Sequence, residues 1–153
     1  MPVRTTWRLL QASVTITLLS LSVLALSACG SDSGSTTLPS ATPTLVTETF
    51  NGTLGQNESR VHNFTVSNSG YTLLTGYTSI SPTSITALGL GIGSWDSTSS
   101  TCSLNLTQND TARSGNTGLS GTVNSGSYCV RAYDGGNITA GATASYTVQV
   151  QHY

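Results

Sequence analysis

Charge is the scarcest property of this sequence. Only 7% of its 153 residues are charged, compared with roughly 25% in an ordinary soluble domain. The sequence contains no lysine, and from residue 29 onward three arginines face six acidic residues. A sparse and weakly acidic set of charges gives no electrostatic footprint for DNA or RNA. We therefore expect no nucleic-acid partner.

Residues suited to catalysis are also few. The two histidines are His62 and His152, and no Gly-x-Ser-x-Gly sequence is present to position a nucleophilic serine. The GLGIG segment at 89–93 superficially resembles a phosphate-binding loop, but it lies in an alternating strand pattern with no helix after it. Its glycines more plausibly allow a side chain or another sheet to approach closely. We predict that the protein is not an enzyme and has no metal site or cofactor.

The first 28 residues have the order of an export signal. Residues 1–8, MPVRTTWR, carry two arginines, and Leu9–Ser27 is an uncharged run whose densest apolar part is VTITLLSLSVLAL. The run is long enough to be a retained membrane span. Against that alternative, serine and threonine interrupt it repeatedly and no cluster of positive charge follows it.

Leu26-Ser27-Ala28-Cys29 resembles the lipobox of bacterial lipoproteins. The resemblance implies cleavage before Cys29 and acylation of that cysteine, with palmitate as a typical chain; the alternative is a plain signal peptide with a chance cysteine. The signal peptide would be 1–28, and the lipidated N-terminus with a flexible Ser/Thr/Pro/Gly linker would be 29–44. We expect a lipid-anchored protein of the bacterial cell envelope that faces the periplasm or the exterior, on the outer membrane where one exists.

From about residue 45 the chain repeats a short β-rich run followed by a turn of Gly, Asn, Ser or Asp. Such regular short strands are typical of a sandwich or barrel, and no stretch after residue 44 has a helical period. Apolar residues alternate along several runs, as in RVHNFTV and YTVQV, and mark one inner face for each. We predict an all-β, antiparallel β-sandwich domain at 45–153. Its strands are expected at 46–54, 60–66, 71–77, 85–92, 102–106, 118–123, 128–133 and 145–150.

Two cysteines, Cys102 and Cys129, remain once Cys29 is assigned to the lipid. Export would deliver them to an oxidising compartment, where pairing is expected. A two-cysteine metal site is the alternative, but no histidine lies at ligand spacing. We predict a disulfide between them.

The segment NSGSYCVRAYDGGNITAGATASYTVQV resembles the C-terminal half of bacterial pre-peptidase C-terminal domains, and ETFNGTL and HNFTVSNSGYTLLT are similar to the opening strands of that family. The resemblance covers about 45–150. It implies a jelly-roll-like sandwich and an auxiliary role in targeting, secretion or adhesion, with calcium in some members. The run of acidic residues usual in the middle strands is missing here.

Four residues are the candidates for a ligand site: Trp95, Asp96, Asp110 and Asp134. The aspartates fall in expected loops, where they could bind calcium or simply stabilise turns, and we favour the turns. Trp95 could be an exposed platform for a sugar or could cover the disulfide. We expect a non-catalytic binding or adhesion module whose partner is an envelope protein or a glycan. The alternative is a structural envelope lipoprotein without a small-molecule ligand.

Overall fold

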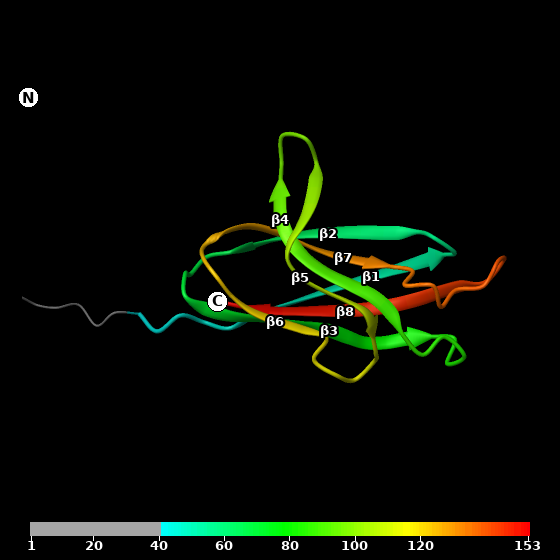
Figure 1. Cartoon of the computed structure of the whole chain (residues 1–153). Helices are drawn as coiled ribbons and strands as arrows, with labels where there is room; N and C mark the ends of the chain where they lie inside the picture. Colours follow the sequence, from blue (N-terminus) through cyan, green and yellow to red (C-terminus); the bar gives the residue numbers. More distant parts are fainter. Residues whose placement is uncertain (1–40) are drawn as a thin grey trace, which may run out of the picture. The chain divides into compact units, whose positions relative to one another are not determined.

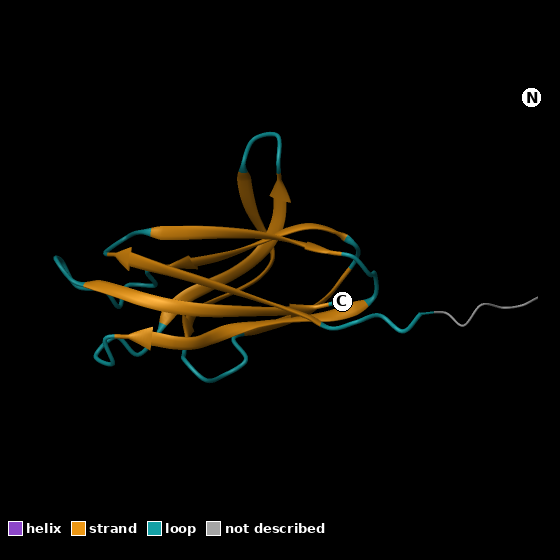
Figure 2. Cartoon of the chain, turned by 180° about the vertical axis from the view of Figure 1, so that it is seen from behind, coloured by secondary structure: helices purple, strands orange, loops and turns teal. Residues whose placement is uncertain are grey.

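The computed structural model of the chain describes residues 41–153, which contain eight strands and no helix. The predicted all-β sandwich is therefore confirmed (Figures 1 and 2). Nothing in the described part of the chain is a helix long and apolar enough to cross a membrane. The predicted signal peptide and Cys29 lie outside the described residues, as does most of the linker. The strands are β1 (Val46–Gly55), β2 (Ser59–Val66), β3 (Tyr71–Ser81), β4 (Leu88–Asp96), β5 (Thr101–Ala112), β6 (Leu119–Val123), β7 (Gly126–Tyr133) and β8 (Thr143–His152).

The strands form two four-stranded antiparallel sheets, with the orders β1-β8-β3-β6 and β2-β7-β4-β5. The chain changes sheet at every connection except the β4–β5 hairpin, which gives an eight-stranded jelly roll. β8 lies in the interior of the first sheet, paired with β1 on one side and β3 on the other. The described chain enters and leaves at the same end of the sandwich (Figure 1), where Val46 pairs with His152.

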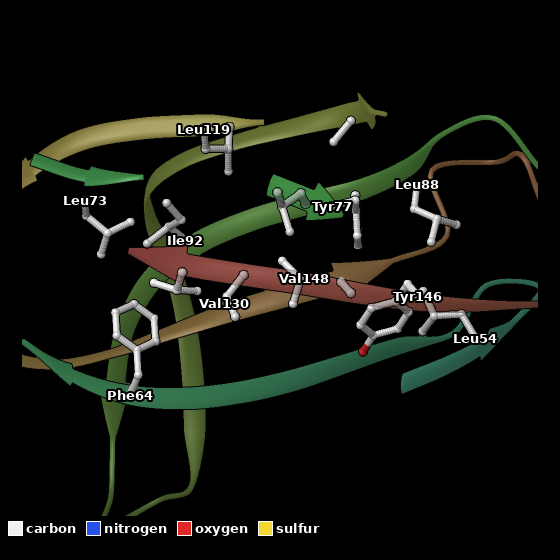
Figure 3. Packing of buried hydrophobic residues seen from close by; sticks show 14 of the residues in the cluster. Leu54, Phe64, Leu73, Tyr77, Leu88, Ile92, Leu119, Val130, Tyr146 and Val148 are labelled. Carbon is white, nitrogen blue, oxygen red and sulfur yellow. The ribbon is translucent and has the colours of Figure 1, made fainter. Parts of the chain in front are cut away.

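The core lies between the two sheets and follows the alternation of the sequence. Figure 3 shows side chains from both sheets directed toward one another. The inner faces expected for β2 and β8 are confirmed, because the alternating residues Phe64, Val66, Tyr146, Val148 and Val150 are buried while most positions between them remain accessible. The largest fully buried side chains include Tyr77, Leu54, Leu73, Leu88, Leu90, Ile92, Val130 and Val148.

Three glycines of β4 are buried on the outer face of the second sheet. The Tyr133 ring covers Gly89 and the Leu104 side chain covers Gly91, while Gly93 packs directly against the backbone of β5 at Ser103. Any other residue would place a Cβ atom in the space that these neighbours occupy. Glycine at the three positions therefore permits the close approach. The structural role expected for the GLGIG segment is confirmed.

Several strand boundaries differ from those expected; β3 continues past Tyr77 to Ser81, and β4 continues past Ile92 to Asp96. The strand expected from Ile85 begins at Leu88, because Ile85 closes a turn in which its N–H donates to the Pro82 carbonyl at 3.0 Å. Ile85 is nevertheless buried and belongs to the core. The strand expected at 102–106 continues to Ala112, since its polar second half pairs with the start of β4.

The β4–β5 hairpin extends beyond the rest of the sandwich (Figures 1 and 2). A disulfide joins Cys102 of β5 to Cys129 of β7, with their Cα atoms 5.8 Å apart. The predicted pairing is confirmed. It ties β5, one residue from the last ladder pair of the hairpin, to the strand on the other side of β4.

Candidate binding site

The four residues predicted to form a ligand site do not converge. Trp95 and Asp96 lie at the end of β4 near the hairpin tip, whereas Asp110 lies opposite the beginning of β4. Seven residues of extended chain separate Gly89 from Asp96, which corresponds to about 23 Å. Asp134 immediately follows β7, whose last residue, Tyr133, pairs with Gly89. Asp134 therefore lies at the Asp110 end, remote from the tip.

Asp96 stabilises the hairpin turn. Its carboxylate accepts hydrogen bonds from the Thr98 N–H at 2.8 Å, the Ser99 N–H at 3.4 Å and the Ser99 hydroxyl at 2.7 Å. The Ser99 hydroxyl is the main cause of the lowered pKa of Asp96, followed by the two backbone donors. The turn interpretation of this aspartate accounts for all of these contacts.

Asp134 fastens two loops together. Its Oδ1 accepts the N–H groups of three successive residues, 136–138, at 2.9–3.1 Å, and its Oδ2 accepts the Asn57 N–H at 3.0 Å. Burial raises the pKa of this carboxyl, but the four backbone hydrogen bonds together lower it further, so its pKa is below the ordinary value. The carboxylate joins the β1–β2 turn to the β7–β8 loop.

Asp110 is engaged by a tyrosine. The Tyr133 hydroxyl donates a short hydrogen bond to the Asp110 carboxylate. Burial, followed by this contact, raises the pKa of Tyr133 to about 12. Among residues 41–153 no group of three or more His, Cys, Asp or Glu side chains could hold a metal ion. The three aspartates therefore offer calcium no shared set of carboxylates.

Trp95 is half-buried and lies directly opposite Cys102 in the β4–β5 ladder. Directly opposed residues of antiparallel strands have Cβ atoms about 5 Å apart and point to the same face. Trp95 therefore flanks the disulfide, and of the three aspartates only Asp96, its sequence neighbour, lies at this end of β4. Trp95 does not belong to the hydrophobic core of the described residues, and that it covers the disulfide stays a prediction.

Both histidines lie inside the sandwich. His62 Nε2 is 2.8 Å from the Tyr146 hydroxyl, and its ring stacks on Phe50 with centroids 5.0 Å apart. Burial lowers the pKa of His62. The burial of His152 could not be expected from its place near the end of the sequence. This residue is only 3% exposed, and its Nε2 is 2.9 Å from a Glu48 carboxylate oxygen. Each histidine thus has a structural partner.

A different surface is the best candidate for binding. The outer face of the first sheet, here called the polar face, consists of the positions that alternate with buried residues on its four strands. None of these side chains is charged, and leucine is the only large apolar residue among them. The polar face comprises Thr47, Thr49, Asn51, Thr53, Thr72, Leu74, Gly76, Thr78, Ser120, Thr122, Ser145, Thr147, Gln149 and Gln151.

A hollow of about 220 Å³, here called the amide hollow, lies on the polar face between β3, β8 and the β5–β6 loop. Its lining includes the carboxamides of Asn116, Gln149 and Gln151 together with Gly76. None of the three carboxamides makes a hydrogen bond to a described residue. Each carboxamide offers two N–H donors and one acceptor oxygen, so the hollow presents a dense set of neutral hydrogen-bonding groups.

One wall of the amide hollow is the loop at 113–118, and its position is fixed. The Gly115 N–H donates to the Tyr77 carbonyl and the Gly118 N–H to the Thr75 carbonyl, both at 2.8 Å. A Cβ atom on Gly76 would meet the carbonyl oxygen of Asn116, so the absence of a side chain allows the loop to cross here. The backbone that carries Asn116 is therefore held in place before any ligand arrives.

A second hollow of about 410 Å³, here called the hydroxyl hollow, lies further along β8. Its lining includes Asn51, Ser81, Ser145 and Thr147. The Thr147 hydroxyl donates to the Asn51 amide oxygen at 2.7 Å. Gln149 of the amide hollow and Thr147 of the hydroxyl hollow are two residues apart on β8, which corresponds to about 7 Å. The sequence analysis missed this surface, although the alternating polar residues S-x-T-x-Q-x-Q of β8 were its signal.

No protein-family model matches the chain, and a search of curated proteins gives no match either. Function is therefore inferred from the fold and from the surface chemistry of the polar face.

Proposed function

We propose that this chain is a bacterial envelope lipoprotein that displays a non-catalytic binding module on a lipid tether. The order of signal, lipobox-like sequence and linker supports the anchor at Cys29. The resemblance of 45–150 to auxiliary domains of secreted proteases supports a role in adhesion. The partner is an envelope protein or a glycan.

The observation that carries the binding role is the polar face with its two hollows. Hydrogen-bonding side chains that have no partner within the described residues lie around a hollow whose wall is fixed by backbone hydrogen bonds. Because the backbone of this wall is already fixed, a ligand would not have to order the loop when it binds.

The anchor is tested by changing Cys29→Ser in the full chain. Labelled palmitate should no longer be incorporated, and the protein should move from the membrane fraction to the soluble fraction, because one thioether-linked cysteine carries the lipid. Retention in the membrane after this change would refute the lipid anchor and favour a retained span.

The binding role is tested with immobilised residues 41–153, which contain every residue of the hydrophobic core. Envelope extract is passed over this domain with and without calcium. Capture of a defined component should be lost in Thr147→Arg, at the centre of the polar face. It should be retained in Thr65→Arg, a matched change at an exposed position of the second sheet. Equal capture by both variants would refute the polar face as the binding surface. Failure to capture anything, together with an envelope defect in a deletion strain, would favour the structural alternative.

A further inference from the structure

The polar face offers a partner no net charge, and its inner strand β8 offers no free edge. Charged side chains are absent from it, so an ionic ligand would lose hydration without gaining a counter-charge. β8, which carries both glutamines of the amide hollow, is bonded to β1 and β3 on its two sides. A peptide could not be recognised there by strand addition, which needs unpaired backbone groups.

The groups that are available suit hydroxyls. Carboxamides and hydroxyls both donate and accept hydrogen bonds, as do the alcohol groups of a sugar. An apolar ligand would desolvate Gln149, Gln151 and Asn116 without replacing their hydrogen bonds to water, which is costly. The chemistry of the face therefore selects a neutral, hydroxyl-rich partner.

The arrangement of the hollows also suits an extended ligand. The amide and hydroxyl hollows are neighbours along β8, because Gln149 lines the first and Thr147, about 7 Å away, lines the second. Both hollows are open, so a chain of sugar units could rest in one and continue into the other.

We propose that the polar face binds a neutral polysaccharide chain along β8, from Gln151 in the amide hollow to Ser145 in the hydroxyl hollow. The inference rests on the proposed binding function and specifies its ligand class. No aromatic side chain projects from this face, so hydrogen bonds alone hold the sugar and the affinity of one domain is weak. Many copies tethered to one membrane would bind the repeating units of a polymer together and compensate for that weakness.

Affinity electrophoresis suits such weak binding. Residues 41–153 are run in native gels containing dextran, a galactomannan or a neutral β-glucan, with alginate as the anionic polymer. At least one neutral polymer should retard the domain, and retardation should be insensitive to salt because no ion pair forms. The double variant Gln149→Ala/Gln151→Ala should weaken the interaction at least tenfold, since two hydrogen-bonding groups are removed.

The matched control is Gln108→Ala, which makes the same chemical change at an exposed glutamine of the second sheet. It should migrate like the parent, and unchanged melting temperatures for all variants confirm that the fold is intact. Retardation of the double variant equal to that of the parent overturns the assignment to the polar face. Retardation by alginate alone, lost at high salt, overturns the neutral ligand class. No retardation by any neutral polymer overturns the polysaccharide inference, while capture of an envelope protein that Thr147→Arg abolishes would still support the binding module.

Discussion

Gly93 should be the least replaceable glycine of β4. An added Cβ atom would lie 2.5 Å from the Ser103 carbonyl carbon and 2.8 Å from the Leu104 Cα, and closer still to the Ser103 carbonyl oxygen. Carbon atoms normally pack at about 3.5 Å or more. The β5 backbone would therefore have to move by about 1 Å. At Gly91 the added atom would instead meet the tips of the Leu104 side chain, 2.7 and 3.0 Å away, which can rotate.

We expect Gly93→Ala to reduce the free energy of unfolding by about 2–3 kcal/mol, in the range measured for overpacked sites. Gly91→Ala should stay within about 1 kcal/mol of the parent, because the entropy that alanine saves in the unfolded chain offsets the repacking of Leu104. For a domain of this size about 4 °C accompanies each kcal/mol, so the two melting temperatures should differ by roughly 8 °C.

The assay is thermal and guanidinium unfolding of residues 41–153, followed by the fluorescence of Trp95, the single tryptophan in that stretch. Trp95 is two residues from Gly93 and reports on the same strand. Equal melting temperatures for the two variants would refute the reasoning, because backbone contact at Gly93 is the only difference invoked.

Two further predictions concern stability. Replacing Cys102 and Cys129 together by alanine should lower the free energy of unfolding by about 3–4 kcal/mol, since the bond closes a loop with a sequence separation of 27 residues; an unchanged guanidinium midpoint would contradict this. Asp134→Asn should cost about 1–2 kcal/mol at neutral pH, because the amide cannot accept from both sides of the loop junction. Its folded-state pKa is lowered, so the stabilisation by the carboxylate is complete above the ordinary value of 3.8 and is lost as the pH falls through the folded value. The free energy of unfolding, measured from about pH 5 down to pH 2, should therefore fall less steeply in the variant than in the parent. Parallel curves of this free energy against pH would exclude the effect.

The fold could be predicted largely from local patterns. Alternation located all eight strands, and turn residues separated them, because each strand buries one face and the connections need Gly, Asn or Asp. The errors occurred where alternation fails. Ile85 is apolar and buried yet lies in a turn, and the second half of β5 is polar on both faces because it lies at the edge of a sheet.

The candidate site was harder to predict because it depends on which strands are neighbours. The glutamines of β8 and Asn116 are more than thirty residues apart, and only the order β8-β3 with the β5–β6 loop brings them to one hollow. The three aspartates were expected in loops and have the chemistry of metal ligands, but Asp96 ends β4 and Asp110 lies in β5, so only Asp134 is in a loop. The structure instead uses Asp96 and Asp134 to satisfy backbone N–H groups, which is the commonest role of aspartate in turns.

The pairing of β1 with β8 sets the order in which the domain can be made. All ten residues of β1 pair with β8, and β8 also provides one neighbour of β3. A growing chain that lacks residues 143–152 therefore has no central strand in its first sheet, and β1 has nothing to pair with there. Such a chain cannot complete its first sheet. Closure of the jelly roll must therefore wait until the last strand has been made.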